Sequence, residues 1–230
     1  MESVWEYRML LWQGTVVTVQ LAVTALGLSV ILGFAGAFAK RSQSVTARAV
    51  AEAYTTVVRG VPDLVLMMLL FYGGQQVLNR LGALTGWWDY VELDQFVAGV
   101  LAIGFVFGAY MTETFRGALL AIPEGQLDAG RAIGFSRVQL FTHISWPQMV
   151  RHALPGFSNN WLVLLKATAL VSVIGLHDLV WNATTAGRSV REPFTFMLAV
   201  LLIYLLLTAL SDLALRRLRR RYEFSDAWHS

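Results

Sequence analysis

Four ionisable residues lie in or beside long apolar stretches of the sequence, and a fifth stands at the entrance to one of them. The four are Asp63, Glu113, Arg116 and Lys166, and the fifth is Arg59. A charge at membrane depth is expensive unless it is paired or faces water, so each of these residues needs an explanation. In such surroundings a carboxylate holds an ion pair, relays protons or contacts a transported solute.

The spacing of these residues leaves both ion pairing and solute binding open. Glu113 and Arg116 are three residues apart, and Arg59 and Asp63 are four apart, so each pair can meet on one helix face. Lys166 can reach back to the cytoplasmic surface or pair with a carboxylate on a neighbouring helix. A cationic solute would instead need negative or aromatic groups in the cavity. The candidates for that role are Asp63, Tyr72, Tyr110 and Glu113.

The motifs of common catalytic chemistry are missing from the sequence. It has no cysteine, which excludes a disulfide, a thiolate metal site and a cysteine nucleophile. Neither lysine, Lys40 or Lys166, follows a glycine, so there is no GxxxxGK(S/T) loop to hold the phosphates of ATP. The four histidines form no HExxH or other metal-binding spacing, and no Gly-x-Ser-x-Gly elbow is present. We therefore expect a chain without catalytic residues, cofactor or metal of its own.

Composition identifies the elements that must position these side chains. Of 230 residues, 56% are hydrophobic and 14% are charged, which is typical of an integral membrane protein. Apolar runs long enough to cross a bilayer predict five helical spans. They cover residues 14–39, 61–79, 96–120, 156–180 and 193–215. Because no linker separates them, we expect residues 1–230 to form a single all-α transmembrane domain.

The distribution of lysine and arginine predicts which side of the membrane each loop faces. Segments 40–53, 121–155 and 216–230 hold eleven basic residues, whereas the segments on the opposite side hold four. Basic residues concentrate in cytoplasmic loops, so these three segments are expected in the cytoplasm and the N-terminus outside. The start of the chain lacks the basic region of a cleavable signal peptide, so the first span is expected to remain as an anchor.

Between the third and fourth spans lies a polar stretch that cannot sit in lipid, and we call residues 123–155 the hairpin segment. It reads as two short helices. Pro123 and Glu124 suit the first turn of a helix, and Gly134 supplies the left-handed residue that ends it. An amphipathic hairpin alone or a DNA-binding helix-turn-helix would also fit, but a DNA reader has no place between two spans.

The second of these short helices has signals at both ends. Ser136 and Gln139 form a capping box that opens it, and Pro147 is expected to close it. Apolar residues recur at every third position along it, which is typical of a surface helix. They are Val138, Phe141 and Ile144.

Within the hairpin segment stands the run Asp128-Ala129-Gly130, three residues, Gly134, nine residues, and Ile144-Ser145-Trp146-Pro147. It resembles the "EAA" loop of ABC importer permeases, Glu-Ala-Ala-x3-Gly-x9-Ile-x-Leu-Pro, with Asp for Glu, Gly for the second Ala and Trp for Leu. Gly130 weakens the first helix by about 1 kcal/mol relative to Ala. The resemblance implies that this loop docks on an ATP-hydrolysing subunit. The residues that would take part are Asp128, Ala129, Gly130, Arg131, Gly134, Ser136, Arg137, Phe141, Ile144 and Pro147.

Three further stretches are YTTVVRGVPDLVLMMLLFYG, GAYMTETFRGALLAIPEGQ and NNWLVLLKATALVSVIGLHDL. They are similar to the Arg-Gly-x-Pro, Tyr-x-x-Glu-x-x-Arg-Gly and Lys-x-Thr-x-Leu segments of polar amino-acid ABC permeases. The likeness runs over nearly the whole chain, from residue 14 to residue 222. It is greatest to the Q-type subunit of histidine and lysine/arginine/ornithine importers and to opine permeases of the same branch.

This resemblance implies a permease with the fold of ABC type I importers and a cytoplasmic coupling hairpin between its third and fourth spans. It would lie in the bacterial inner membrane and move polar, basic amino acids or opines. The implied partners are a homologous second permease, two copies of a cytoplasmic ATPase that binds ATP and magnesium, and a periplasmic amino-acid-binding protein. No nucleic acid is expected. The alternatives are a self-sufficient ion-coupled transporter that uses Asp63 and Glu113, and a membrane-embedded enzyme, for which no catalytic constellation can be assembled.

Overall fold

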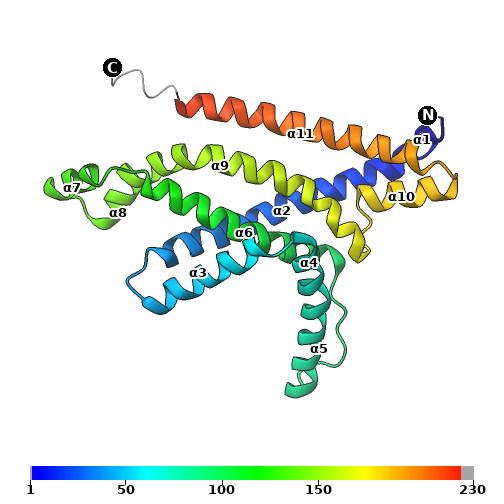
Figure 1. Cartoon of the computed structure of the whole chain (residues 1–230), viewed down its shortest axis with the longest axis horizontal. Coiled ribbons are helices and arrows are strands. Elements are labelled where there is room, and N and C mark those ends of the chain that lie inside the picture. The colour runs from blue at the N-terminus through cyan, green and yellow to red at the C-terminus, as the bar shows by residue number, and fades with distance from the viewer. Residues whose placement is uncertain (1, 224–230) are drawn as a thin grey trace.

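Figure 1 shows the computed structural model of the chain, an elongated bundle of helices in which residues 2–223 are described. No strand occurs within that range, in agreement with the all-α prediction. A short helix, α1 (Glu2–Glu6), precedes the bundle. Four helical stretches of the described chain are long and apolar enough to cross a membrane. They are α2 (Arg8–Lys40), α6 (Gln95–Leu120), the stretch Arg137–Ile174, and Pro193–Tyr222 of α11 (Pro193–Glu223).

The second predicted span belongs to a bent pair of helices. The first arm is α3 (Val45–Gly60), and the second consists of α4 (Asp63–Met68), a π-helical stretch η1 (Leu69–Gly73) and α5 (Gly74–Thr85). The helix direction bends by 115° between the arms, and α5 projects away from the bundle (Figure 1). Val61 is extended at the break because Pro62 disfavours a helical conformation in the residue before it. The described chain thus has four candidate spans, or five if the bent pair counts as one.

The hairpin segment differs from the prediction in its second half. Its first helix is α7 (Glu124–Ala132), but the second does not end at Pro147. It continues without interruption from α8 (Arg137–Gln139) through the π-helical η2 (Leu140–Ser145) into α9 (Trp146–Ala167) and the 3₁₀-helical η3 (Thr168–Ile174). Proline is tolerated in the first turn of a helix, and Pro147 lies there, in α9, directly after the π-helical stretch.

The fourth predicted span, 156–180, therefore differs from the observed helix, Arg137–Ile174, at both ends. Its helix starts well before residue 156, and it ends at Ile174 because Gly175 takes a left-handed conformation with φ of 91°. Residues 179 and 180 belong instead to α10 (Leu179–Ser189), which lies beside the N-terminal part of α2. Figure 1 shows α10 and the N-terminus at the end of the bundle opposite to α7 and α8.

Small residues hold α2 against α6, the most extensive helix pair of the fold. Gly33 and Gly36 are buried on α2 and face Met111 and Thr112 of α6. A Cβ atom on Gly33 would lie only 2.5 Å from the Cβ of Met111, so the two backbones approach as closely as they do only because glycine stands there. This close contact brings the C-terminal half of α6 beside the C-terminal end of α2.

Candidate coupling site

The turn of the hairpin segment is closed by two backbone hydrogen bonds after α7. The N–H of Gly134 donates to the carbonyl of Arg131, and that of Phe135 donates to the carbonyl of Gly130, both at 3.0 Å. This is the Schellman arrangement, and Gly134 has the left-handed conformation it needs, with φ of 87°. The sequence prediction for the end of the first helix is therefore correct at Gly134.

The second arm starts with the predicted capping box. The N–H of Gln139 donates to Ser136 Oγ at 3.4 Å, and the N–H of Ser136 donates to Gln139 Oε1 at 2.8 Å. These bonds satisfy backbone donors that the start of a helix leaves free. The chain direction thus reverses between two fixed helix ends, Gly134 and Ser136.

Gly130 permits the two arms of the hairpin segment to touch. It is the only buried residue of α7, and a Cβ atom on it would lie 2.6 Å from Leu140 Cδ2 and 2.7 Å from Ile144 Cδ1. Both side chains belong to η2, which packs against α7. Glycine at this position therefore has a packing reason, although it lowers the helix propensity of α7.

Beyond this contact, the tip of the hairpin segment exposes apolar side chains. Ile133 is 72% exposed and Val138 is 70% exposed, one on each side of the turn. Charged groups surround them, because Arg137 is exposed and Arg131 forms a 2.5 Å ion pair with Asp128 across one turn of α7. The predicted apolar stripe of the second arm is divided: Val138 points to the surface, whereas Phe141 is half-buried.

A cluster of aromatic rings connects the hairpin segment to the spans. The ring of Phe141 lies 6.0 Å from those of Phe38 and Trp146, measured between centroids. Trp146 in turn lies 5.8 Å from Phe34, which stacks on Phe115 of α6 at 4.1 Å with nearly parallel planes. Because Phe34 and Phe38 belong to α2, the cluster joins η2 and the start of α9 to two spans. Contacts of this kind are specific in geometry and worth more than the area that they bury.

A second connection, made of charges, lies at the same end of the bundle. The Lys40 ammonium group bridges Glu113 Oε1 at 2.5 Å and Glu52 Oε2 at 2.7 Å. Arg116 donates from Nε and Nη2 to the other oxygen of Glu113, at 2.9 Å and 2.8 Å. The Lys40 side chain is only 5% exposed, so this cation is buried and fully dependent on its carboxylates. Glu113 and Arg116 therefore do lie together as an ion pair, within a larger cluster that joins α2, α3 and α6.

Of the remaining charged candidates, Arg59 and Asp63 lie near Tyr110, whereas Lys166 lies on α9. The guanidinium carbon of Arg59 lies 5.6 Å from the centre of the Tyr110 ring, and Asp63 is close enough to Tyr110 to interact with it electrostatically. The pairing expected between Arg59 and Asp63 is absent from the described part of the chain, because the break at Pro62 takes them off a common helix face. Tyr72 lies on η1, half-exposed, against Phe71 at 5.0 Å.

Among the described residues, Lys166 lacks the carboxylate partner that was one of its two predicted roles. It is exposed on α9, and no ion pair to it occurs among residues 2–223. Asn159, two helical turns earlier on the same face, is exposed as well. A polar and cationic face within a membrane-spanning helix must be covered by water or protein, since lipid would leave the charge unsolvated.

Comparison with known proteins identifies the chain. Residues 29–224 match the family model described as "Binding-protein-dependent transport system inner membrane component". The chain belongs to this permease family. The family is one of inner-membrane proteins, and the several apolar helices of this permease make it a multi-pass member.

Curated relatives place this permease in one branch of the family. It is 50% identical over 210 residues to the histidine/lysine/arginine/ornithine transport system permease protein HisQ of Salmonella typhimurium, covering 91% of this chain and 92% of HisQ. It is 42% identical to the octopine transport system permease protein OccQ of Rhizobium meliloti, over 89% and 86% of the two chains. The arginine ABC transporter permease protein ArtQ of Haemophilus influenzae is 37% identical, over 94% and 95%. This permease is thus homologous to subunits of ABC importers for amino acids and opines.

Solved structures agree with the fold of this permease. A chain of an amino acid ABC transporter crystallised with histidines superposes with a TM-score of 0.79 at 29% identity, over 95% of this chain and 97% of that one. A chain of the MetNI methionine ABC transporter superposes with a TM-score of 0.74 at 19% identity, over 94% and 98%, which is a likeness of fold alone. The permease fold of ABC type I importers, expected from the sequence, is therefore the observed one.

Sequence reasoning missed the connections that join the hairpin segment of this permease to its spans. Lys40 is 73 residues from Glu113, and no local pattern indicates that they meet. Phe34, Phe38 and Phe115 look in the sequence like ordinary lipid-facing residues of apolar spans. Trp146 was the one visible signal, because a tryptophan in place of leucine next to Pro147 adds an aromatic ring beside the turn.

Proposed function

We propose that this permease forms one half of the translocation pathway of an ATP-driven importer, and that a cytoplasmic ATPase drives it through residues 128–147. The main support is the exposed tip, where Ile133 and Val138 present apolar surface surrounded by the charges of Asp128, Arg131 and Arg137. Exposed apolar groups within a polar rim are typical of a protein interaction site. We propose that Ala129, Gly130, Gly134 and Ser136 maintain the shape of this tip.

The contacts behind the tip provide a mechanical path. When the ATPase subunits close on ATP, they would push α7, which rests on Leu140 and Ile144 through Gly130. The push would pass through Phe141 and Trp146 to α2 and α6. Because Pro147 does not interrupt the second arm, η2 and α9 would move as one body and tilt the fourth span.

A second, homologous permease would supply the other half of the pathway, together with two ATPase copies and a periplasmic binding protein. The exposed face of α9 with Lys166 and Asn159 supports this assembly, because it needs a polar cavity or a protein partner at membrane depth. We retain the orientation predicted from the basic residues, with the hairpin segment in the cytoplasm and the N-terminus outside, in the bacterial inner membrane.

For the solute, we propose a polar, basic amino acid or an opine, following the names of the relatives that are similar over most of their length. Such solutes carry both cationic and anionic groups. Asp63 and Arg59 offer both signs of charge beside the ring of Tyr110, and Tyr72 is a further candidate for lining the solute pathway. Both oxygens of Glu113 are already bonded to cations, so we assign Glu113 to the charge cluster and away from the solute.

Cross-linking tests the coupling role directly, since the chain has no native cysteine. Single cysteines would replace Ile133 or Val138 at the tip, and Leu84, 83% exposed on α5, would serve as the matched control. The tip variants are expected to cross-link to the co-purified ATPase, in an amount that changes with ATP, whereas Leu84→Cys is not. Absence of any tip cross-link in an assembled, active complex would overturn the proposed docking site.

Membership of the family favours this ATP-driven mechanism over a self-sufficient ion-coupled transporter. A direct check is uptake by proteoliposomes that contain the permease without any ATPase. We expect no uptake when a pH gradient is applied, and uptake under these conditions would instead favour proton coupling through Asp63 and Glu113.

A further inference from the structure

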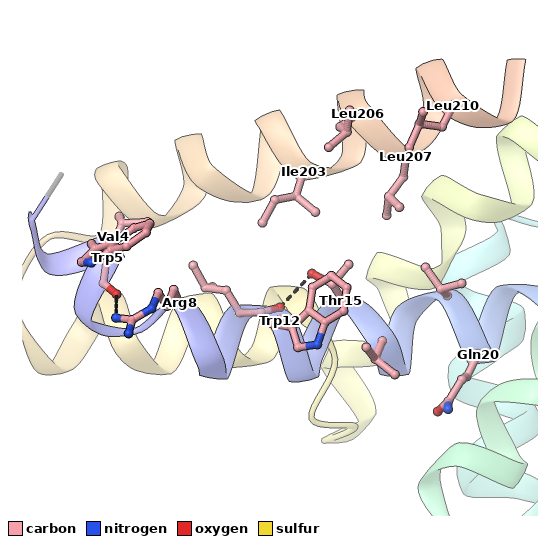
Figure 2. Close-up of a pocket in the computed structure, with 13 residues that line it drawn as sticks. Val4, Trp5, Arg8, Trp12, Thr15, Gln20, Ile203, Leu206, Leu207 and Leu210 are labelled. Atoms are coloured by element: carbon pink, nitrogen blue, oxygen red, sulfur yellow. Dashed lines mark hydrogen bonds between the residues drawn. The ribbon is translucent and has the colours of Figure 1, made fainter. Parts of the chain in front are cut away.

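A groove with a volume of about 740 Å³ runs between the first and last spans, at the end of the bundle that carries the N-terminus. One wall consists of α1 and the first half of α2, and the other consists of α11. Figure 2 shows Ile203, Leu206 and Leu210 of α11 facing Trp12 and Thr15 of α2 across it. Apart from Arg8, Thr15 and Gln20, all the lining residues are apolar.

The length of the groove limits what can occupy it. From Arg8 to Gln20 the helix advances by twelve residue steps, which rise about 18 Å at 1.5 Å each. The hydrocarbon core of a bilayer is about 30 Å thick, so the apolar part of the groove is about as deep as one leaflet. A transmembrane helix of another subunit would need the full thickness, whereas the acyl chain of a phospholipid needs one leaflet only.

The groove is also arranged as a phospholipid would require, with a charged residue at one end and apolar residues along its length. Arg8 lies at the end nearest the N-terminus, exposed, with its guanidinium carbon 4.8 Å from the centre of the Trp5 ring. One of its N–H groups donates to the Trp5 carbonyl at 2.9 Å (Figure 2), and among the described residues it forms no ion pair. Arginine has five N–H donors, so several remain for a phosphate. Trp5 and Trp12 are of the type that sits at headgroup depth.

We propose that this groove binds a phospholipid of the leaflet on the N-terminal side. Its phosphate accepts hydrogen bonds from Arg8, and an acyl chain lies between α2 and α11 against Trp12 and Leu206. Because the last span contacts α10 and α9 far more than α2, the lipid completes the packing between the first span and the last. The site is independent of ATPase docking, since the hairpin segment lies at the other end of the bundle (Figure 1).

The test compares bound phospholipid in variants of the assembled transporter, purified from nanodiscs of phosphatidylethanolamine and phosphatidylglycerol and quantified by mass spectrometry. Leu206→Trp fills the groove, and Leu201→Trp is its matched control, since Leu206 is 59% and Leu201 57% exposed but only Leu206 lines the groove. We expect Leu206→Trp to lose one tightly bound phospholipid per permease and Leu201→Trp to keep it.

The headgroup contact is tested separately. Arg8→Gln is expected to weaken phospholipid binding about tenfold, as loss of a charge-assisted hydrogen bond does, whereas Arg188→Gln, an exposed arginine of α10, leaves it unchanged. Equal lipid retention by Leu206→Trp and Leu201→Trp would overturn the proposed site. So would density for a helix of the second permease in the groove of the assembled complex. Either result would leave the coupling role of the hairpin segment untouched, because the readout is bound lipid.

Discussion

The ammonium group of Lys40, at the end of the first span, lies 2.5 Å from Glu113 Oε1 in the third. The same nitrogen also reaches Glu52 of α3, and Arg116 holds the second oxygen of Glu113. Two of the three helices that meet here, α2 and α6, also carry the aromatic contacts of the hairpin segment. The charge cluster therefore holds α2, α3 and α6 together during the proposed coupling motion.

Removing Lys40 should destabilise the permease through Glu113. Lys40→Met leaves a largely buried carboxylate with Arg116 alone, and breaking one partner of a buried pair costs about 3 kcal/mol. The double variant Lys40→Met/Glu113→Gln removes the carboxylate as well and should cost less than the sum of the two single changes. Reversible unfolding in detergent measures each value, with Lys40→Arg as the charge-preserving control. Strictly additive losses would mean that Lys40 and Glu113 are not coupled.

Gly130 should tolerate no branched side chain. Gly130→Val would drive its Cβ and methyl groups into Leu140 and Ile144, and overpacking of this kind costs about 1–3 kcal/mol. Gly125→Val, on the same helix with nothing within 4 Å of the new Cβ, makes the same change in intrinsic helix propensity without the clash. ATPase association and uptake should fall for Gly130→Val and stay near wild type for Gly125→Val. Similar losses in both would contradict the packing role of Gly130, because Gly125→Val introduces the same side chain without the clash.

Phe141 should be needed for coupling more than for assembly. Phe141→Ala removes the ring that lies between Phe38 and Trp146, and aromatic pairs contribute about 0.5–1.5 kcal/mol each. The ATPase should still co-purify, because the exposed tip is unchanged, but solute uptake per ATP hydrolysed should drop. Phe141→Tyr keeps the ring and should retain coupling. A normal ratio of uptake to hydrolysis in Phe141→Ala would remove the aromatic cluster from the mechanical path.

Asp178 should make the permease more stable in mild acid. It lies beyond the end of the fourth span and caps α10 by accepting from the Trp181 N–H at 2.8 Å, while its Oδ2 is buried without a hydrogen-bond partner among the described residues. Burial raises the pKa of this carboxyl from 3.8 to about 6, although the backbone N–H of Trp181 acts in the opposite direction.

The sign of the effect follows from that shift. With its pKa raised in the folded state, the protonated Asp178 favours folding below pH 3.8, and this contribution disappears as pH rises through about 6. Asp178→Asn should therefore stabilise the permease at pH 8, by up to about 3 kcal/mol, and give no gain near pH 4. Thermal unfolding followed by tryptophan fluorescence measures it. A pH-independent effect of Asp178→Asn would contradict the prediction.

Local patterns were enough to predict the membrane class, the presence of several long apolar helices, the turn at Gly134 and the capping box at Ser136, because these depend on hydropathy and on the conformations of a few neighbouring residues. They failed at Pro147, which was predicted to end the second helix of the hairpin segment. Proline ends a helix only if the hydrogen bonds before it are regular. A π-helical stretch precedes Pro147, and the helix continues. The helix α3 and the bend at Pro62 also escaped, because the predicted span 61–79 falls within the second arm of the bent pair.

The sequence by itself determined that this chain crosses a membrane, carries a polar stretch between two apolar runs and has no GxxxxGK(S/T) motif. Only the tertiary structure decided that Glu113 is bound by Lys40 and that Phe141 meets Phe38. The reason is that such contacts join residues far apart in the chain. Their positions depend on how closely α2 approaches α6 at Gly33 and Gly36, and no pattern within a single helix determines which face of its neighbour it will meet.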